Sequence, residues 1–210
     1  MCVSAIIPAY NEAKYIGDVL KVLRDVEEIT QIIVVSDGST DHTVGEALKW
    51  GVQVIALRKN IGKGGALTIG LQYANEEIVL FLDADLLGLT VNHIQCLIKP
   101  IITKEAEMAI GVFENGRLVT DAAQALYPYL SGQRCIRKSC LAQIKDLAFS
   151  GFGAEAVLTH YAQRENMETV YVQLPKMSHV MKEEKLGLVK GFASRMKMYW
   201  EIAKNARLGG

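Results

Sequence analysis

Short, nearly uninterrupted apolar runs alternate with stretches of helical periodicity in the first half of the chain, and this alternation restricts the fold more than any other feature. The apolar runs read as strands and cover Val3 to Pro8, Gln31 to Ser36, Val52 to Leu57 and Ile78 to Leu82. A helical spacing of i, i+3, i+4 and i+7 joins Ile16, Val19, Leu20 and Leu23, and a second helical stretch runs from Gly64 to Ala74. Strands that are apolar on both faces and separated by helices indicate parallel β-α-β units. We therefore predict an α/β fold, a single Rossmann-like domain with a mostly parallel sheet sandwiched by helices.

The second half of the chain has a looser pattern. We expect a strand at Glu107 to Val112 and an extended segment at Val170 to Met181, with helices at Thr120 to Leu130, Gly153 to Arg164 and Leu186 to Leu208. A chain of 210 residues is long enough for one sizeable core and short for two. The expected organisation is one domain at residues 1–185, with halves at 1–90 and 91–185, and a C-terminal amphipathic helical extension at 186–210.

Charge and cysteine usage exclude several classes of protein. The 23 basic residues equal the 23 acidic residues, so no net field favours a nucleic-acid partner. The four cysteines form no CxxC pair, the chain does not open with a signal-peptide pattern, and no apolar run approaches the ~20 residues of a membrane span. We therefore expect a protein of the reducing cytoplasm. The oligomeric state is left open, a homodimer included.

Polar clusters follow each of the four predicted strands in the first half. They are "PAYNE" (Pro8 to Glu12), "DGSTD" (Asp37 to Asp41), "RKNIGKGGA" (Arg58 to Ala66) and "DAD" (Asp83 to Asp85). Each one alone could cap a helix or turn the chain. In open α/β sheets, however, ligands bind beyond the carboxyl ends of the strands, so four such clusters converge on one edge. Their joint placement favours a binding site.

The two aspartates of "DAD" indicate a divalent metal. Asp83 and Asp85 stand two residues apart at the end of an apolar strand, where two ionised carboxylates repel unless a cation lies between them. Oxygen ligands suit Mg²⁺ or Mn²⁺, which complete their coordination with water and substrate phosphates. Lys63 could add positive charge from a glycine-rich loop, and Asp37 is placed to accept from a base imide or a ribose hydroxyl. The pattern predicts a nucleoside diphosphate that carries a transferable group.

Other phosphate-binding motifs fit less well. A Walker loop needs a glycine where Leu57 stands and a hydroxyl residue where Gly64 stands, and no glycine triplet follows the first strand as a dinucleotide fingerprint requires. Phosphatases with a nucleophilic aspartate carry their DxD at the first strand, and nucleotidyltransferases of related architecture open with a glycine-rich loop that contains arginine. A nucleotidyltransferase and a non-catalytic nucleotide-sugar binding protein remain as the alternatives.

The ordered motifs "IIPAYNE", "VVSDGSTDHT", "GKGGAL" and "VLFLDADL" resemble the GT-A glycosyltransferases of family 2. The resemblance implies a GT-A fold in which residues 1–90 are the nucleotide-sugar half and 91–185 the acceptor half. It implies a nucleotide pocket, usually for UDP, and a DxD that binds metal and diphosphate. The pocket residues would be Pro8, Tyr10, Glu12, Asp37 and Lys63, the DxD would be Asp83 and Asp85, and Ala84 would line the same substrate site.

The second half resembles the glucosyl-3-phosphoglycerate synthases more loosely. The similar segments are "GRLVT" (Gly116 to Thr120), "SGFGAE" (Ser150 to Glu155) and "KMSHVMKEEKLG" (Lys176 to Gly187), although "GRLVT" holds one residue more than the family spacing and the chain is much shorter. The resemblance implies substrate contacts from Gly116 and Arg117. It also implies that a late histidine, His179, completes the metal site. The expected reaction is the metal-dependent transfer of a hexose from a UDP-sugar, UDP-glucose above all, to an acceptor hydroxyl or phosphate.

Three further interpretations concern single residues or segments. Glu155, in the first turn of a predicted helix, is a candidate base for the acceptor hydroxyl, with a helix-dipole role as its competitor, and Asp85 is the second catalytic candidate. Arg134, in "SGQRCIRK", either faces a substrate phosphate or is solvated. The basic, aromatic C-terminal helix either packs on the domain, which we favour, or lies on a membrane that presents a lipid-phosphate acceptor.

Overall fold

A seven-stranded sheet forms the centre of the computed structural model, which describes residues 1–113, 131–141, 144 and 153–179, with only the backbone of His179. The strands in sheet order are β3 (Gln53–Ala56), β2 (Ile29–Ser36), β1 (Val3–Ala9), β4 (Ile78–Phe81), β7 (Arg134–Arg137), β6 (Met108–Phe113) and β8 (Thr169–Leu174). The helices are α1 (Ile16–Arg24), α2 (Thr43–Leu48), α3 (Lys63–Tyr73), α4 (Val91–Ile102), α6 (Lys138–Leu141) and α7 (Ala154–Arg164). The predicted α/β architecture is confirmed.

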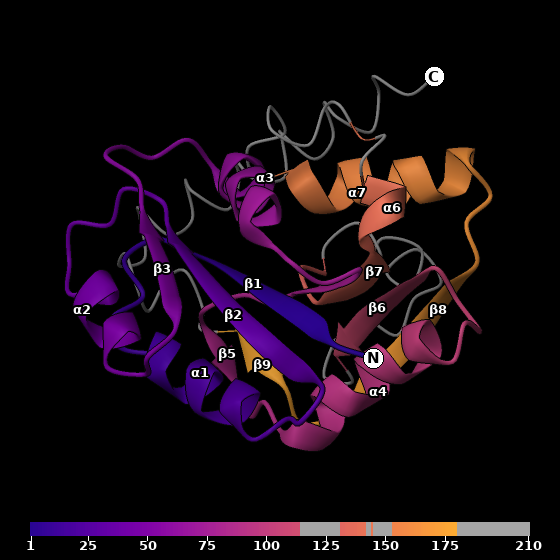
Figure 1. Cartoon of the computed structure of the whole chain (residues 1–210), viewed down its shortest axis with the longest axis horizontal. Coiled ribbons are helices and arrows are strands. Elements are labelled where there is room, and N and C mark those ends of the chain that lie inside the picture. Colours follow the sequence, from indigo (N-terminus) through magenta and orange to yellow (C-terminus); the bar gives the residue numbers. More distant parts are fainter. Residues whose placement is uncertain (114–130, 142–143, 145–152, 180–210) are drawn as a thin grey trace.

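Helices cover both faces of this sheet. Figure 1 shows α1, α2 and α4 on one face and α3, α6 and α7 on the other. Side chains of β1 alternate between the two cores, because successive residues of a strand point to opposite faces. Ala5 and Ile7 pack with α1 and α4, whereas Ile6 packs with α3. The four apolar residues expected on one face of α1 are all buried, as the spacing predicted.

The first four core strands have the predicted parallel pairing. β1 lies between β2 and β4 and is parallel to both. The chain therefore adds β2 and β3 on one side of β1 and then adds β4 on the other side. Reversals of this kind open a crevice at the carboxyl edge of the sheet. The loops that carry the four polar clusters leave the sheet at this edge.

Strand β7 departs from the predicted pattern. It is antiparallel to β4 and to β6, and it lies between them although it follows β6 in the chain. Its sequence, "RCIR", is too short and too charged at its ends for the strand to be recognised from apolar runs. Because it runs in the opposite direction, β7 begins at the edge of the sheet where β4 ends, and Arg134 pairs with Phe81 there.

The extended segment predicted at Val170 to Met181 is interrupted within its described part. Strand β8 ends at Leu174, a turn follows at which Lys176 has φ +60°, and β9 (Ser178–His179) then leaves the main sheet. β9 pairs antiparallel with β5 (Leu86–Leu87), so that Leu86 lies opposite His179. The helices predicted at 120–130 and 186–208 fall outside the described residues. In the described part of the chain, none of the helices has the length and apolar character that crossing a membrane requires.

Candidate functional site

The loops that follow β1 and β2 form one hydrogen-bonded unit at the carboxyl edge of the sheet. The backbone N–H of Glu12 donates to Thr43 Oγ1 at 2.8 Å, and that of Ala13 donates to Asp41 Oδ2 at 3.1 Å. Burial works to raise the pKa of Asp41, but hydrogen bonds from Thr43 and Ala13 outweigh it and lower the pKa. Pro8 and Glu12 are half-buried in this unit, and Tyr10 is 50% exposed. The unit leaves the Tyr10 ring available to a ligand.

Asp37 fixes the loop that leads into α3. Its Oδ1 accepts from the backbone N–H of Ile61 at 2.8 Å and its Oδ2 from that of Gly62 at 2.9 Å. The residue is 4% exposed, and burial raises the pKa of its carboxyl against the lowering effect of the two amides. Asp37 therefore positions the start of α3 and with it Lys63. Its expected contact with the base or ribose stays a prediction.

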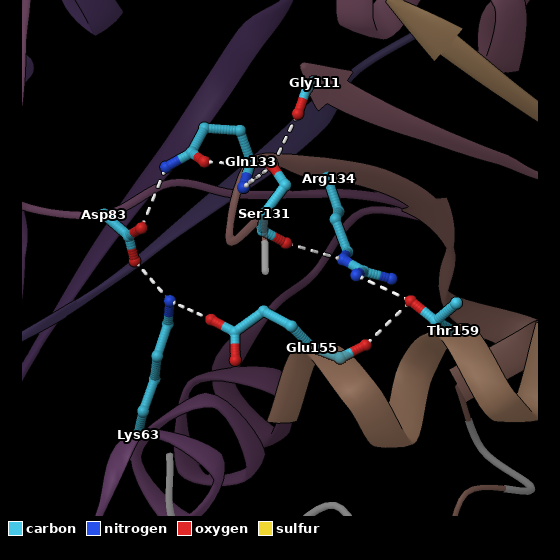
Figure 2. A network of polar contacts seen from close by, with 8 residues as sticks. All are labelled: Lys63, Asp83, Gly111, Ser131, Gln133, Arg134, Glu155 and Thr159. Atoms are coloured by element: carbon cyan, nitrogen blue, oxygen red, sulfur yellow. Dashed lines mark hydrogen bonds and ion pairs between the residues drawn. The ribbon is translucent and has the colours of Figure 1, made fainter. Parts of the chain in front are cut away.

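Lys63 is the first residue of α3. The sequence pattern predicted a position in the loop that precedes this helix. Its ammonium lies between the carboxylates of Asp83 and Glu155 and forms an ion pair with each (Figure 2). Burial alone would lower the pKa of Lys63, but the two carboxylates reverse this effect and raise it well above its ordinary value. The three side chains are between 10% and 19% exposed, so these charges interact in a partly desolvated setting.

Two residues that the sequence did not single out complete the surroundings of Asp83. Gln133 Nε2 donates to Asp83 Oδ2 at 2.9 Å. A Cβ atom added at Gly132 would lie 2.6 and 2.8 Å from the two oxygens of Asp83, so only glycine lets the backbone pass this close. Both residues precede β7 and reach Asp83 because β7 runs antiparallel to β4. Both residues belong to the segment "SGQR". No spacing within the sequence connects this segment to the DxD, so the contact with Asp83 could not be predicted from it.

Arg134 lies behind Glu155 within the protein. It is 1% exposed, its Nε donates to the carbonyl of Ser131 at 3.0 Å, and its Nη2 donates to Thr159 Oγ1 at 2.8 Å. Thr159 Oγ1 donates in turn to the carbonyl of Glu155 at 2.9 Å (Figure 2). Burial lowers the pKa of Arg134 to about 10, although Glu155 acts to raise it. The expectation that Arg134 is solvated is wrong because its guanidinium is buried against protein atoms, where it fixes the first turn of α7. Its expected contact with a substrate phosphate stays a prediction.

The second aspartate of the DxD connects the main sheet to the small one. Asp85 is half-buried, Ala84 is 3% exposed, and β5 begins at the next residue, Leu86. Since Leu86 pairs with His179, the backbone of His179 lies beside the DxD, as the proposed ligand role requires. The His179 side chain is outside the description, as are Gly116 and Arg117.

The chemistry of the acidic residues fits a hard divalent cation. Asp83 and Asp85 offer carboxylate oxygens at one strand end, and Asp83 already balances a cation, the Lys63 ammonium. The described residues include no group of three or more histidine, cysteine, aspartate or glutamate side chains arranged to hold a metal. A magnesium-type site does not need one, because it takes one or two carboxylates and draws its other ligands from phosphates and water.

Several known proteins with similar sequences are named as glycosyltransferases. An uncharacterised glycosyltransferase of Escherichia coli, YaiP, is 45% identical over 91 residues, which are 40% of this chain and 22% of that protein. The dolichyl-phosphate beta-glucosyltransferase of Drosophila melanogaster is 32% identical over 139 residues, 57% of this chain and 42% of that protein. The chain thus spans less than half the length of these curated relatives.

The fold is also found in solved structures. Glucosyl-3-phosphoglycerate synthase of Mycobacterium tuberculosis, crystallised with Mn²⁺, UDP-glucose and phosphoglyceric acid, matches with a TM-score of 0.78 and 24% identity over 98% of this chain and 79% of that one. At this identity the likeness shows a shared fold. The sequence itself matches the profile of Glycosyl transferase family 2 over residues 4–165. Together with the DxD at the carboxyl edge of a doubly wound sheet, this match shows that the chain belongs to glycosyltransferase family 2.

Proposed function

We propose that the chain is a metal-dependent hexosyltransferase that moves a hexose from a UDP-sugar, with UDP-glucose as the donor, to a hydroxyl or phosphate of an acceptor. The observation that carries the proposal is the convergence of Lys63, Asp83 and Glu155 at the carboxyl edge of the sheet in a family 2 member. The crystallised neighbour that binds UDP-glucose and the relative that is a dolichyl-phosphate beta-glucosyltransferase both support a glucose donor. Their names also support an acceptor that carries a phosphate, either a small molecule or a lipid.

Asp83 and Asp85 are the residues that would hold Mg²⁺ or Mn²⁺, with His179 as a third ligand. The fit rests on their oxygen chemistry and on the charge that Asp83 already balances. When bound, such an ion supplies Lewis-acid stabilisation to the diphosphate of the donor. The proposed catalytic role of Asp85 is to hold this ion.

Lys63 would stabilise the departing UDP. As the bond from the hexose C1 to the β-phosphate oxygen breaks, negative charge grows on the diphosphate, and a positioned ammonium at a helix N-terminus favours that charge. Ion pairs with Asp83 and Glu155 hold the ammonium in place before the donor arrives. Lys63 is thus charged and oriented in advance, which avoids reorganisation during the reaction.

Glu155 would act on the acceptor side. Its carboxylate points toward Lys63 from the first turn of α7, and Arg134 and Thr159 fix that turn from behind. We assign it the role of base or hydrogen-bond partner to the acceptor hydroxyl. The remaining proposed contacts are Pro8, Tyr10, Glu12, Asp37 and Ala84 in the donor half, and Gly116 and Arg117 in the acceptor half.

The identity of the nucleotide product tests this proposal. The protein is incubated with UDP-glucose, Mn²⁺ and a panel of phosphorylated acceptors, and the products are separated by chromatography. We expect UDP, and we expect Asp83→Asn to abolish it while Asp25→Asn, at the exposed end of α1, does not. Cleavage between the α- and β-phosphates would instead identify a nucleotidyltransferase, and binding of UDP-glucose without any product would identify a non-catalytic binding protein.

A further inference from the structure

Two segments far apart in the sequence meet directly behind the DxD. One is Leu86 to His93, which contains β5 and the first turn of α4, and the other is Pro175 to His179, which contains the turn after β8 and β9. The backbone pairs Leu86 with His179 and Leu87 with Ser178 are their first connection, and Figure 1 shows β5 and β9 side by side. We call these two segments the clasp.

Gly88 provides the second connection. Its φ is +76°, a left-handed conformation that favours glycine, and a Cβ atom there would collide with the carbonyl oxygen of Lys176 and lie 3.7 Å from Met177 Cα. Lys176 is itself left-handed, with φ +60°, so both backbones bend at the point where they touch. Met177 is fully buried in the core, which anchors the turn. The approach of the two segments is therefore built into the backbone.

His93 provides the third connection. It lies in the first turn of α4, is 5% exposed, and its imidazole donates a hydrogen bond to the backbone carbonyl of Pro175. Its Nδ1 is buried and has no hydrogen-bond partner among the described residues. A buried imidazole nitrogen without a hydrogen-bond partner costs free energy, and a leucine or isoleucine at this position would avoid that cost. The hydrogen bond to Pro175 is what the histidine adds to this position.

We infer that the clasp positions the metal site, with Gly88 and His93 as positioning residues that hold the Ser178–His179 strand against the DxD. The inference rests on the proposed function, because it takes Asp83, Asp85 and His179 as the metal ligands. The geometry is direct: β5 begins immediately after Asp85, and its first residue pairs with His179. Any shift of the turn at residues 175–177 therefore changes the separation of Asp85 and His179.

The test measures the Kd of each variant for UDP with Mn²⁺ and with EDTA. We define the metal gain as the Kd with EDTA divided by the Kd with Mn²⁺. Gly88→Ala should reduce the metal gain by about tenfold, the lower end of the loss typical when groups that orient metal ligands are disturbed. The matched control is Gly51→Ala. Gly51 has a comparable φ of +65°, but a Cβ atom there would meet nothing within 4 Å, so it carries the backbone strain without the collision. His93→Leu should act like Gly88→Ala, and His93→Gln, which keeps a donor, should restore much of the gain.

A double variant separates positioning from general damage. If the clasp acts through His179, then His179→Ala alone reduces the metal gain, and Gly88→Ala added to it causes no further loss. Additive losses, a metal gain in Gly88→Ala equal to that in Gly51→Ala, or a gain that survives His179→Ala would each overturn the inference. Failure of the proposed metal site is distinguishable, because the unmodified protein would then show no metal gain at all. Failure of the proposed transfer reaction is read separately from the nucleotide product and leaves the metal gain unchanged.

Discussion

One ammonium group balances two carboxylates at the centre of the site. Lys63 pairs with Asp83 and Glu155, and the fully buried Arg134 supplies a second positive charge behind Glu155. Partly desolvated charges interact more strongly than surface ones, so removal of any one member disturbs the others. The arrangement is suited to a ligand that carries both a divalent cation and a diphosphate, since the two bring opposite charges into the same space.

At the residue scale we predict that Glu155→Gln lowers turnover by about a hundredfold, at the lower end of the contribution of general acid–base groups. The Kd for UDP should change far less than turnover, because glutamine keeps the shape and an oxygen that can accept from Lys63. Turnover is measured as UDP release, and binding by titration. Glu165→Gln, the same substitution at the exposed end of α7, is the control. Unchanged turnover in Glu155→Gln would leave Glu155 with the helix-dipole role alone.

The sequence predicted Lys63, Asp83 and Glu155 as site residues, and the structure brings all three together. Asp83 follows from a local pattern, since two carboxylates at a strand end need a cation. Gln133 and Gly132 could not be predicted, because their contact with Asp83 depends on the antiparallel insertion of β7 and not on any spacing within the chain. The burial of Arg134 was missed for a related reason: its partners include Met108 of β6 and Thr159 of α7, which are distant from it in sequence.

At the element scale, Gly70 allows α3 to pack closely on the sheet. A Cβ atom at Gly70 would collide with Ile6 Cγ2 of β1 and would lie 3.3 Å from Val35 Cγ2 of β2. The close approach of α3 to these two strands is therefore possible only with glycine there. It sets the position of the helix whose first residue is Lys63.

We predict that Gly70→Ala destabilises the protein by about 1–2 kcal/mol, because overpacking typically costs about 1–3 kcal/mol and the gain in helix propensity returns up to about 1 kcal/mol. Gly45→Ala in α2 is the matched control, since a Cβ atom there meets nothing within 4 Å. It should stabilise the protein by about 0.5–1 kcal/mol. Urea denaturation measures both, and a Gly70→Ala variant as stable as Gly45→Ala would contradict the packing account.

The elements show which sequence patterns are informative. Strands buried on both faces were located to within a few residues, because an unbroken apolar run has few other interpretations. β5 and β9, of two residues each, have no pattern of their own and form only because the chain brings them together. The turn at Pro175 and Lys176 divided a segment that apolar content alone predicted to be continuous.

At the scale of the whole molecule, the doubly wound sheet collects residues that are distant in sequence. The loops after β1, β2 and β3 and the end of β4 all meet at the edge where the strand order reverses around β1. The antiparallel β7 and the start of α7 bring the second half of the chain to the same place. A site between the two halves can hold a donor on one side and an acceptor on the other, as a transferase requires.

The central claim is that Asp83 and Asp85 bind a metal–diphosphate group, and a UDP titration with Mn²⁺ and with EDTA tests it most directly. For the unmodified protein we expect EDTA to weaken UDP binding by at least about tenfold, or about 1.4 kcal/mol of binding free energy, because it removes the cation that joins the carboxylates to the diphosphate. Asp85→Asn should remove this difference while the protein stays folded, and the exposed Asp25→Asn should preserve it. Equal affinity of the unmodified protein for UDP with Mn²⁺ and with EDTA would contradict the claim.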